Sequence, residues 1–157
     1  MAAGDSPLAE PAERVLELTR VFAAPRSLLF KVWIEPEHLV RWWGPRGFTM
    51  PSHAIDLRPG GAYRFCMRSP EGTTHWLQGV YREIVEPERL AFTYAWEDAE
   101  GAPRHETLVT LRFAEQGGKT RLTLRQEVFE SVTARDAHRE GWASNLDRLA
   151  DYLAAAP

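Results

Sequence analysis

The chain is 157 residues long, carries a formal net charge of −3 at pH 7, and contains one cysteine and six tryptophans. A chain of this length buries on the order of 70% of its unfolded surface, so we expect one domain with a sizeable core. The basic residues are scattered, which argues against a nucleic-acid partner. A single cysteine, Cys66, excludes an intrachain disulfide and is typical of a reducing compartment, so we expect a cytoplasmic protein.

The N-terminal region divides into a tail and a strand. Residues 1–13 are rich in Ala, Glu and Pro without periodicity, which predicts a flexible tail followed by a domain over 14–157. The tail lacks the basic start and apolar run of a signal peptide, so we expect neither a signal peptide nor a membrane span. Alternation of side-chain character over 14–22 predicts the first strand.

Two prolines mark the beginnings of two short helices. Pro25 suits the first position of a helix with apolar side chains on one side, and Pro36 can begin a second helix that runs to Trp42. The segment Trp42-Trp43-Gly44-Pro45-Arg46-Gly47-Phe48 then ends the helical pattern and places two indoles where the chain crosses the domain. Such a cluster either fills a core or lines a cavity.

Beyond this segment the apolar period becomes two, which is the period of a strand. Gly and Pro pairs suited to tight turns separate the strands, and every connection is short, so we expect an antiparallel meander. The final segment, 133–155, returns to helical spacing with one apolar face. We therefore expect an α+β fold in which a roughly seven-stranded sheet wraps around this long helix. The predicted strands after the first are 53–57, 62–68, 74–85, 90–97, 105–113 and 120–129.

The alternation assigns a set of large side chains to the face between sheet and helix. Aliphatic members of this set are expected to form core, whereas buried phenol and indole groups need hydrogen-bond partners that a ligand can supply. The face of 74–85 is ambiguous, because Gly79 can mark a bulge that reverses it, and the placement of Trp76 depends on this choice. Gly141 is expected to allow close backbone approach beside Trp142. The candidate cavity residues are Trp42, Trp43, Phe48, Tyr63, Phe65, Trp76, Tyr94, Trp96, His105, Gln126, His138 and Trp142.

The polar residues do not form a recognisable catalytic or metal motif. No two of the five histidines stand four residues apart as ligands on a helix would, and paired cysteines are absent from the sequence. We therefore expect no metal and no organic cofactor, and the sequence identifies no catalytic residue. His138 and Asn145 lie on the predicted inner face of the final helix, and each is expected to be hydrogen-bonded at the rim of the core, with a contact to a ligand as the alternative.

Seven short motifs follow one another between residues 14 and 155. They are Phe22-x-x-Pro25, Trp33, Trp42-Trp43-Gly44-Pro45-x-Gly47-Phe48, Asp56-x-Arg58-x-Gly60-Gly61-x-Tyr63-x-Phe65, Gly79-x-Tyr81-x-Glu83-Ile84, Pro87-x-Arg89-Leu90 and Gly141-Trp142-x-x-x-Leu146-x-Arg148-Leu149. In this order they resemble the "activator of the heat-shock protein 90 ATPase" family, within the START-like, or SRPBCC, superfamily. The resemblance implies a helix-grip fold with a deep hydrophobic cavity between the sheet and the C-terminal helix. Functions in this superfamily range from lipid carriers to polyketide cyclases and cochaperones.

We therefore expect non-catalytic binding of a small hydrophobic or aromatic molecule in the cavity. Two alternatives stay open: a cofactor-independent enzyme of the polyketide cyclase or aromatase type, and a protein-interaction or cochaperone-like module. The family's eukaryotic cochaperones carry an additional N-terminal domain that makes much of the chaperone contact. Only residues 1–13 precede the first predicted strand of this chain, so we do not expect a chaperone partner. A homodimer is compatible with the sequence.

Overall fold

The computed structural model describes residues 14–155, so the predicted tail over 1–13 lies outside the described residues. The described residues form a seven-stranded antiparallel sheet in the order β1-β7-β6-β5-β4-β3-β2, together with three helices. This arrangement confirms the predicted α+β helix-grip fold. The elements are β1 (Val15–Phe22), α1 (Arg26–Ile34), α2 (Pro36–Trp42), β2 (Thr49–Ile55), β3 (Ala62–Arg68), β4 (Thr74–Val85), β5 (Arg89–Trp96), β6 (Thr107–Gln116), β7 (Lys119–Glu127) and α3 (Val132–Ala155).

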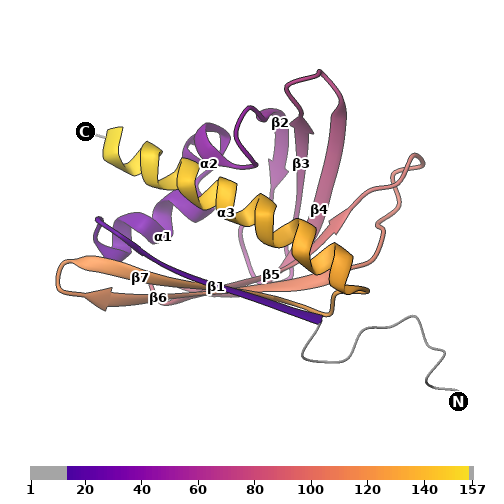
Figure 1. The fold of residues 1–157 in the computed structure, drawn as a ribbon. Coiled ribbons are helices and arrows are strands. Elements are labelled where there is room, and N and C mark those ends of the chain that lie inside the picture. The colour runs from indigo at the N-terminus through magenta and orange to yellow at the C-terminus, as the bar shows by residue number, and fades with distance from the viewer. Residues whose placement is uncertain (1–13, 156–157) are drawn as a thin grey trace, which may run out of the picture.

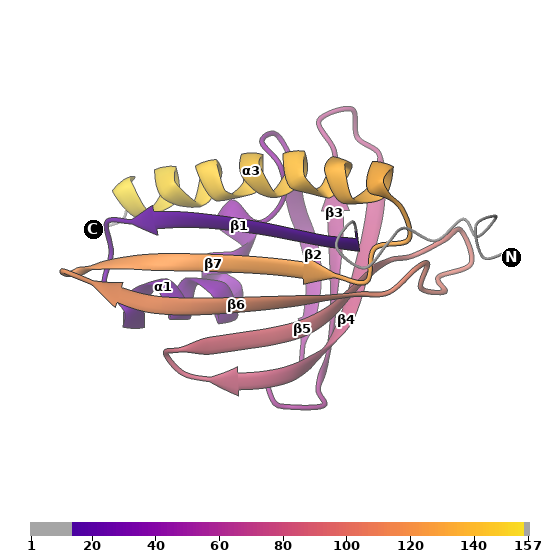
Figure 2. The ribbon, with the colours of Figure 1, turned by 60° about the horizontal axis from the view of Figure 1, so that its bottom comes forward.

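The helix α3 lies across the concave face of the sheet, and β2, β3 and β4 stand at a steep angle to β1, β7 and β6 (Figures 1 and 2). The register between β4 and β5 shifts between Tyr81 and Glu83, an irregularity that bends a sheet. The backbone of α3 comes closest to β1 and α2. The middle strands are thus covered by side chains of α3 and not by its backbone.

Several strand boundaries differ from the prediction by one to three residues, as in β6, which was predicted over 105–113 and is found at Thr107–Gln116. Two further differences involve prolines. Pro25 precedes α1 as its N-cap, with φ −64° and ψ 151°, and is not the first helical residue. Strand β2 begins at Thr49, four residues before the predicted start, and includes Pro51. This strand lies at the edge of the sheet, and its register with β3 shifts between Thr49 and Ser52. A proline is tolerated at an edge or a bulge, where its missing N–H removes no ladder hydrogen bond.

The core is an aromatic cluster built where α1, α2 and α3 meet the sheet. The indole of Trp33 packs edge-on against Trp42 and Trp43, with ring centroids 4.7 Å and 5.7 Å away. Trp42 is fully buried, and its Nε1 donates to the carbonyl oxygen of Val32 at 3.0 Å. Such edge-to-face pairs stabilise beyond the area they bury. Of the two adjacent tryptophans, Trp42 is therefore a core residue.

Gly79 allows a close aromatic contact within the sheet. It pairs with Tyr63 on β3, whose hydroxyl donates to the carbonyl oxygen of Thr93 at 2.6 Å. A Cβ atom on Gly79 would lie 2.0 Å from the same carbonyl oxygen and 2.5 Å from the Tyr63 ring. Gly79 therefore does not mark the bulge, which lies farther along β4, between Tyr81 and Glu83.

The segment that follows α2 is fastened to α3. Nη1 of Arg148 lies 3.3, 3.4 and 3.3 Å from the carbonyl oxygens of Trp43, Gly44 and Pro45, and donates toward all three. Gly44 has φ +95°, a left-handed conformation that favours glycine. Farther on, Arg46 pairs with Asp151 at 2.6 Å. These contacts hold the segment as a wall beside the helix.

Candidate functional site

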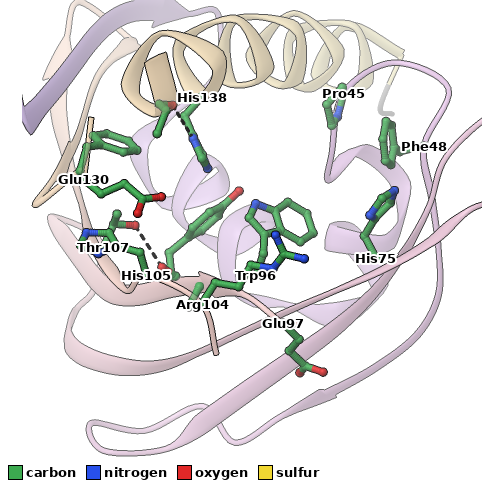
Figure 3. A pocket seen from close by; sticks show the side chains of 14 residues that line it. Pro45, Phe48, His75, Trp96, Glu97, Arg104, His105, Thr107, Glu130 and His138 are labelled. Atoms are coloured by element: carbon green, nitrogen blue, oxygen red, sulfur yellow. Dashed lines mark hydrogen bonds between the residues drawn. The ribbon is translucent and has the colours of Figure 1, made fainter. Parts of the chain in front are cut away.

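A cavity of about 550 Å³ lies between the first half of α3 and the strands β4, β5 and β6 (Figure 3). Its walls are largely aromatic, with Phe48, Tyr94, Trp96 and Phe129 among the lining residues. Exposed Arg104, from the β5–β6 connection, brings a positive charge to its rim. Exposed Glu130, between β7 and α3, adds a negative charge there.

A second chamber of about 240 Å³ continues from this cavity under α3. Both spaces are lined by Pro45, Tyr94, Trp96 and His138, so they adjoin along these four residues. We call the larger space the outer chamber and the smaller one the inner chamber. Trp43, Gly44, Ala137, Gly141, Trp142 and Asn145 complete the lining of the inner chamber.

Gly141 opens into the inner chamber and does not serve close backbone packing. A Cβ atom added there meets no atom of the described residues within 4 Å. The expectation of close approach beside Trp142 was therefore wrong. Because α3 packs its backbone most closely against β1 and α2, the Gly141 side of the helix faces space.

Tyr94 and Trp142 divide the two chambers from the core. Their rings lie 5.9 Å apart, and Tyr94 also packs against Trp96 at 6.0 Å. Burial raises the pKa of the Tyr94 phenol well above its ordinary value, and a hydrogen bond from Trp96 offsets part of this rise. Tyr94 therefore presents a neutral hydroxyl at physiological pH.

A chain of hydrogen bonds fixes the Trp142 indole. Its Nε1 donates to Oε1 of Gln126 at 2.7 Å, and Nε2 of Gln126 donates to Oγ1 of Thr107 at 2.8 Å. Thr107 in turn donates to the carbonyl oxygen of Tyr94 at 3.0 Å. Every group in this chain is buried and paired, so it acts as a rigid support behind the cavity.

Two histidines on opposite walls are held by backbone carbonyl groups. Nδ1 of His138 lies 2.8 Å from the carbonyl oxygen of Ala134, which can only accept, so Nδ1 carries the proton. In the neutral ring Nε2 is then an acceptor, and Figure 3 shows the ring directed into the cavity. His105 is held in the same way by the carbonyl oxygen of Val128, through Nε2.

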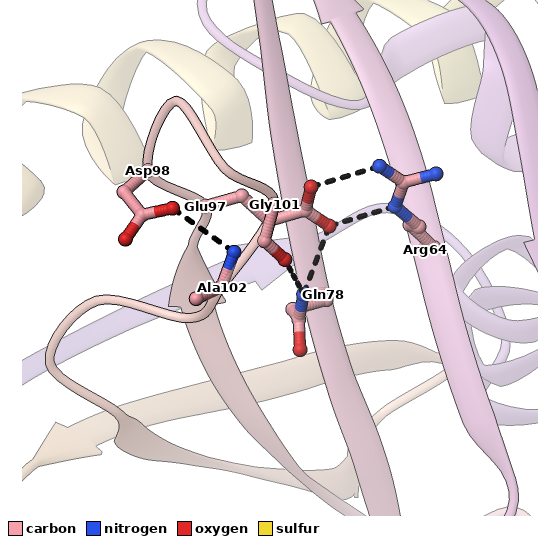
Figure 4. A network of polar contacts seen from close by, with 6 residues as sticks. All are labelled: Arg64, Gln78, Glu97, Asp98, Gly101 and Ala102. Atoms are coloured by element: carbon pink, nitrogen blue, oxygen red, sulfur yellow. Dashed lines mark hydrogen bonds and ion pairs between the residues drawn. The ribbon is translucent and has the colours of Figure 1, made fainter.

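Glu97 anchors the connection that carries Arg104 and His105. Although its backbone borders the outer chamber, Figure 3 shows its carboxylate directed away from the space. The carboxylate accepts from Nε and Nη2 of Arg64 at 2.7 and 2.8 Å, and from Nε2 of Gln78 at 2.9 Å (Figure 4). These bonds lower the pKa of Glu97.

We expect Glu97→Gln to lower the free energy of unfolding by about 1 kcal/mol at pH 7, because Arg64 is half exposed and the pair is partly screened. A carboxylate with a lowered pKa in the folded state stabilises above its unfolded pKa, about 4.3, and loses this as the pH falls through the folded value. The difference between wild type and variant should therefore shrink below about pH 4. Urea denaturation at pH 7, 5 and 3 measures it, and a constant difference would contradict the assignment.

The structure distributes the predicted cavity residues over three environments. Trp42, Tyr63, Phe65 and Gln126 are buried core and line neither chamber; Tyr63 and Phe65 border instead a void of about 10 Å³ that also touches Trp43. The chambers are lined by Trp43, Phe48, Tyr94, Trp96, His105, His138 and Trp142.

Trp76 lies on the opposite face of the sheet, and its assignment to the cavity was wrong. Its ring stacks under the Arg64 guanidinium, with 3.8 Å between Cζ and the ring centroid. The inward position belongs to the neighbouring residue, His75, whose ring lies 6.2 Å from Trp96 and 6.4 Å from Phe48. Along β4, His75, Leu77 and Gly79 lie on the inner face. The apolar character of Trp76 had suggested that this residue, and not His75, points inward.

Three further residues were missed. Arg104 and Glu130 stand in connections, where no period assigns a side chain to a face. Asn145 was placed on the inner helix face but was not selected as a cavity residue, and it proves to be 4% exposed in the wall of the inner chamber.

Residues 14–155 hold no group of three or more His, Cys, Asp or Glu side chains arranged for a metal ion. None of the helices in this range is long and apolar enough to cross a membrane.

Residues 23–154 match the protein family described as "Activator of Hsp90 ATPase homolog 1-like protein". The chain belongs to this family. A family member from Silicibacter pomeroyi, named AHSA1, is 30% identical and has a TM-score of 0.83, with 89% of this chain and 97% of that one covered. A protein from Rhodobacter sphaeroides is 27% identical with a TM-score of 0.79, covering 96% and 99%. No curated protein matches the sequence significantly.

The family and the fold together support a ligand-binding or cochaperone-like module. A third solved structure, from Nitrosomonas europaea, is 27% identical with a TM-score of 0.76 and covers 90% of this chain. These relatives agree with the fold over most of the chain, covering 89%, 96% and 90% of it. The choice between ligand and protein partner therefore depends on the cavity itself.

Proposed function

We propose that the protein reversibly binds a small hydrophobic or aromatic molecule between the sheet and α3, without changing it chemically. The observation that carries this proposal is the pair of adjoining chambers, of about 550 Å³ and 240 Å³, which give the cavity the size of a small-molecule site. Phe48, Tyr94 and Trp96 supply apolar walls, and desolvation of the ligand against them drives binding. No metal or cofactor takes part in this mechanism.

A cavity-filling variant gives the sharpest test. Because a Cβ at Gly141 meets none of the described residues within 4 Å, Gly141→Leu begins a side chain in open space beside the inner chamber and also improves helix propensity. We expect naphthalene at ten times its Kd to raise the unfolding free energy of the wild type by about 1.4 kcal/mol, and to quench or shift tryptophan emission. Gly141→Leu should be at least as stable as wild type and bind naphthalene at least tenfold more weakly.

Calorimetric melting and tryptophan fluorescence measure both effects. Gly141→Ala is the matched control, because it changes helix propensity in the same direction but fills little of the chamber. If naphthalene and a panel of longer aliphatic probes leave the wild-type melting temperature and emission unchanged, the cavity is not a binding site and the proposal is wrong.

One observation favours the cyclase-type enzyme as a second candidate. His138 presents Nε2 toward the cavity while Ala134 holds Nδ1–H, which is the arrangement of an oriented general base. In that case His138→Gln would abolish turnover of a polyketide-like substrate and leave binding of apolar probes intact. If the protein only binds its ligand, neither the wild type nor His138→Gln turns over such a substrate.

A further inference from the structure

The place where the two chambers meet carries two polar side chains, Tyr94 and His138. Both line the outer and the inner chamber, and their rings lie 5.7 Å apart, one on β5 and the other on α3. The other two residues shared by the chambers offer a ligand no polar side-chain group: Pro45 has none, and the Trp96 indole N–H is engaged with the Tyr94 hydroxyl oxygen. Hydrogen bonding at the junction therefore depends on Tyr94 and His138.

Tyr94 supplies a hydrogen-bond donor at this junction. The residue is 8% exposed, and burial raises the pKa of its phenol, so the hydroxyl keeps its proton. Within the described residues the hydroxyl oxygen accepts from Trp96. A hydroxyl that accepts one hydrogen bond can still donate its own proton to a second group. A ligand carbonyl oxygen is such a group.

His138 supplies an acceptor beside this donor. Its Nδ1–H is held by the carbonyl oxygen of Ala134 at 2.8 Å, so Nε2 of the neutral ring carries a lone pair. Figure 3 shows the ring directed into the cavity, and packing against Phe129 at 5.1 Å holds it there. The neutral ring cannot exchange its donor and its acceptor without losing the bond to Ala134. The junction therefore presents a donor and an acceptor of fixed roles on neighbouring rings.

The other polar groups of the cavity do not form such a pair. Arg104, His105 and Glu130 are exposed, so a bond to a ligand there replaces a bond to water and gains little. Asn145 lines the inner chamber alone and follows His138 by seven residues, which is about 10 Å along a helix. It therefore cannot share one small ligand group with His138.

We propose that the ligand is an aromatic molecule bearing a neutral carboxamide, whose carbonyl oxygen accepts from Tyr94 and whose N–H donates to His138. The inference rests on the proposed function of the cavity and names its ligand class as aromatic amides. A primary carboxamide or a lactam carries an acceptor and a donor on one edge, which complements the two neighbouring groups. A carboxylate would set an oxygen against the acceptor of His138. The indoles of Trp43 and Trp142 provide apolar wall for the ligand ring.

Three naphthalenes of nearly equal shape test the proposal. 2-Naphthamide has the acceptor and the donor, 2-acetylnaphthalene has the acceptor alone, and 2-isopropenylnaphthalene has neither. Dissociation constants are measured at pH 8, where a free imidazole is neutral. Ratios between probes are then compared between proteins, which cancels the different hydration of the probes.

Each variant should change one ratio. In Tyr94→Phe the preference for 2-acetylnaphthalene over 2-isopropenylnaphthalene should fall about tenfold, as for one lost buried hydrogen bond. In His138→Leu the preference for 2-naphthamide over 2-acetylnaphthalene should fall by a similar factor. Should His138→Leu not fold, His138→Phe keeps a flat ring without the acceptor and must show the same fall. Gly141→Leu is the control for occupancy, since it should weaken all three probes together and leave both ratios unchanged.

The outcomes separate this inference from the proposed function. If the probes bind the wild type and the two ratios stay the same in the Tyr94 and His138 variants, the inference is wrong while the cavity still binds. A change at only one of the two positions also overturns it, because the proposal requires both groups. Ratios that shift equally in Gly141→Leu would show that shape decides, which contradicts the inference as well. If none of the three probes binds the wild type, both proposals fail.

Discussion

Replacing Trp142 by alanine should lower the free energy of unfolding by about 3 to 5 kcal/mol. The indole is 4% exposed and packs against Trp43 at 5.6 Å and Trp33 at 6.1 Å, so its removal leaves a hole that rigid neighbours cannot close. The variant also leaves Oε1 of Gln126 without its donor, which adds to the loss. Denaturant titration followed by circular dichroism measures the change.

The same variant should enlarge the inner chamber, which Trp142 lines. A bulky aromatic probe that fills the hole should then restore part of the lost stability, because binding to the native state alone adds stability by mass action. Trp76→Ala is the matched indole control: its ring lies on the outer face under Arg64, so we expect a loss of about 1 kcal/mol and no rescue by the probe. A Trp142→Ala protein as stable as wild type would show that this indole does not face the sheet and that the register of α3 is wrong.

The variant Gly79→Ala should lose about 3 kcal/mol or more, although it adds a single carbon atom. The new Cβ would stand 2.0 Å from the Thr93 carbonyl oxygen and 2.5 Å from the Tyr63 ring, so strands β4 and β5 must separate or the tyrosine must leave its place. Leaving its place would also break the 2.6 Å hydrogen bond from Tyr63 to Thr93. A large fall in the denaturant midpoint is the expected measurement.

Gly141→Ala provides the control for a glycine with free space. Its Cβ meets nothing within 4 Å and its helical backbone suits alanine, so we expect a gain of about 0.5 to 1 kcal/mol. Equal effects of the two substitutions would mean that glycine content, and not the Tyr63 contact, determines the result at Gly79.

Much of the fold follows from the hydrophobic periodicity of the chain and from the positions of its Gly and Pro turns. The change from helical spacing to alternation after Trp42, and back again near Thr133, predicts the number and order of the elements. Strands β3 and β4 have the predicted bounds, because Gly and Pro turns flank each of them. The start of β2 was missed because Pro51 resembles a strand break unless the strand is known to lie at an edge.

The candidate site was only partly predictable, since periodicity assigns a face but not a neighbour. Tyr94, Trp96 and His138 share the inner face and do line the chambers, whereas Tyr63 and Phe65 share that face and are core. Which inward residue borders open space depends on how far α3 stands from each strand. That distance is set by contacts between segments far apart in the chain.

The sequence by itself determines that α3 has an inner face and that β4 alternates. Only the tertiary structure decides that His75 and not Trp76 turns inward, because this depends on the pairing of β4 with β3 and β5. It also decides that the oxygen of Asn145 has no hydrogen-bond donor among residues 14–155, while both ends of the Gln126 amide are paired. A side chain's hydrogen bonds are a property of the groups brought around it, and for a buried amide those groups come from other elements of the fold.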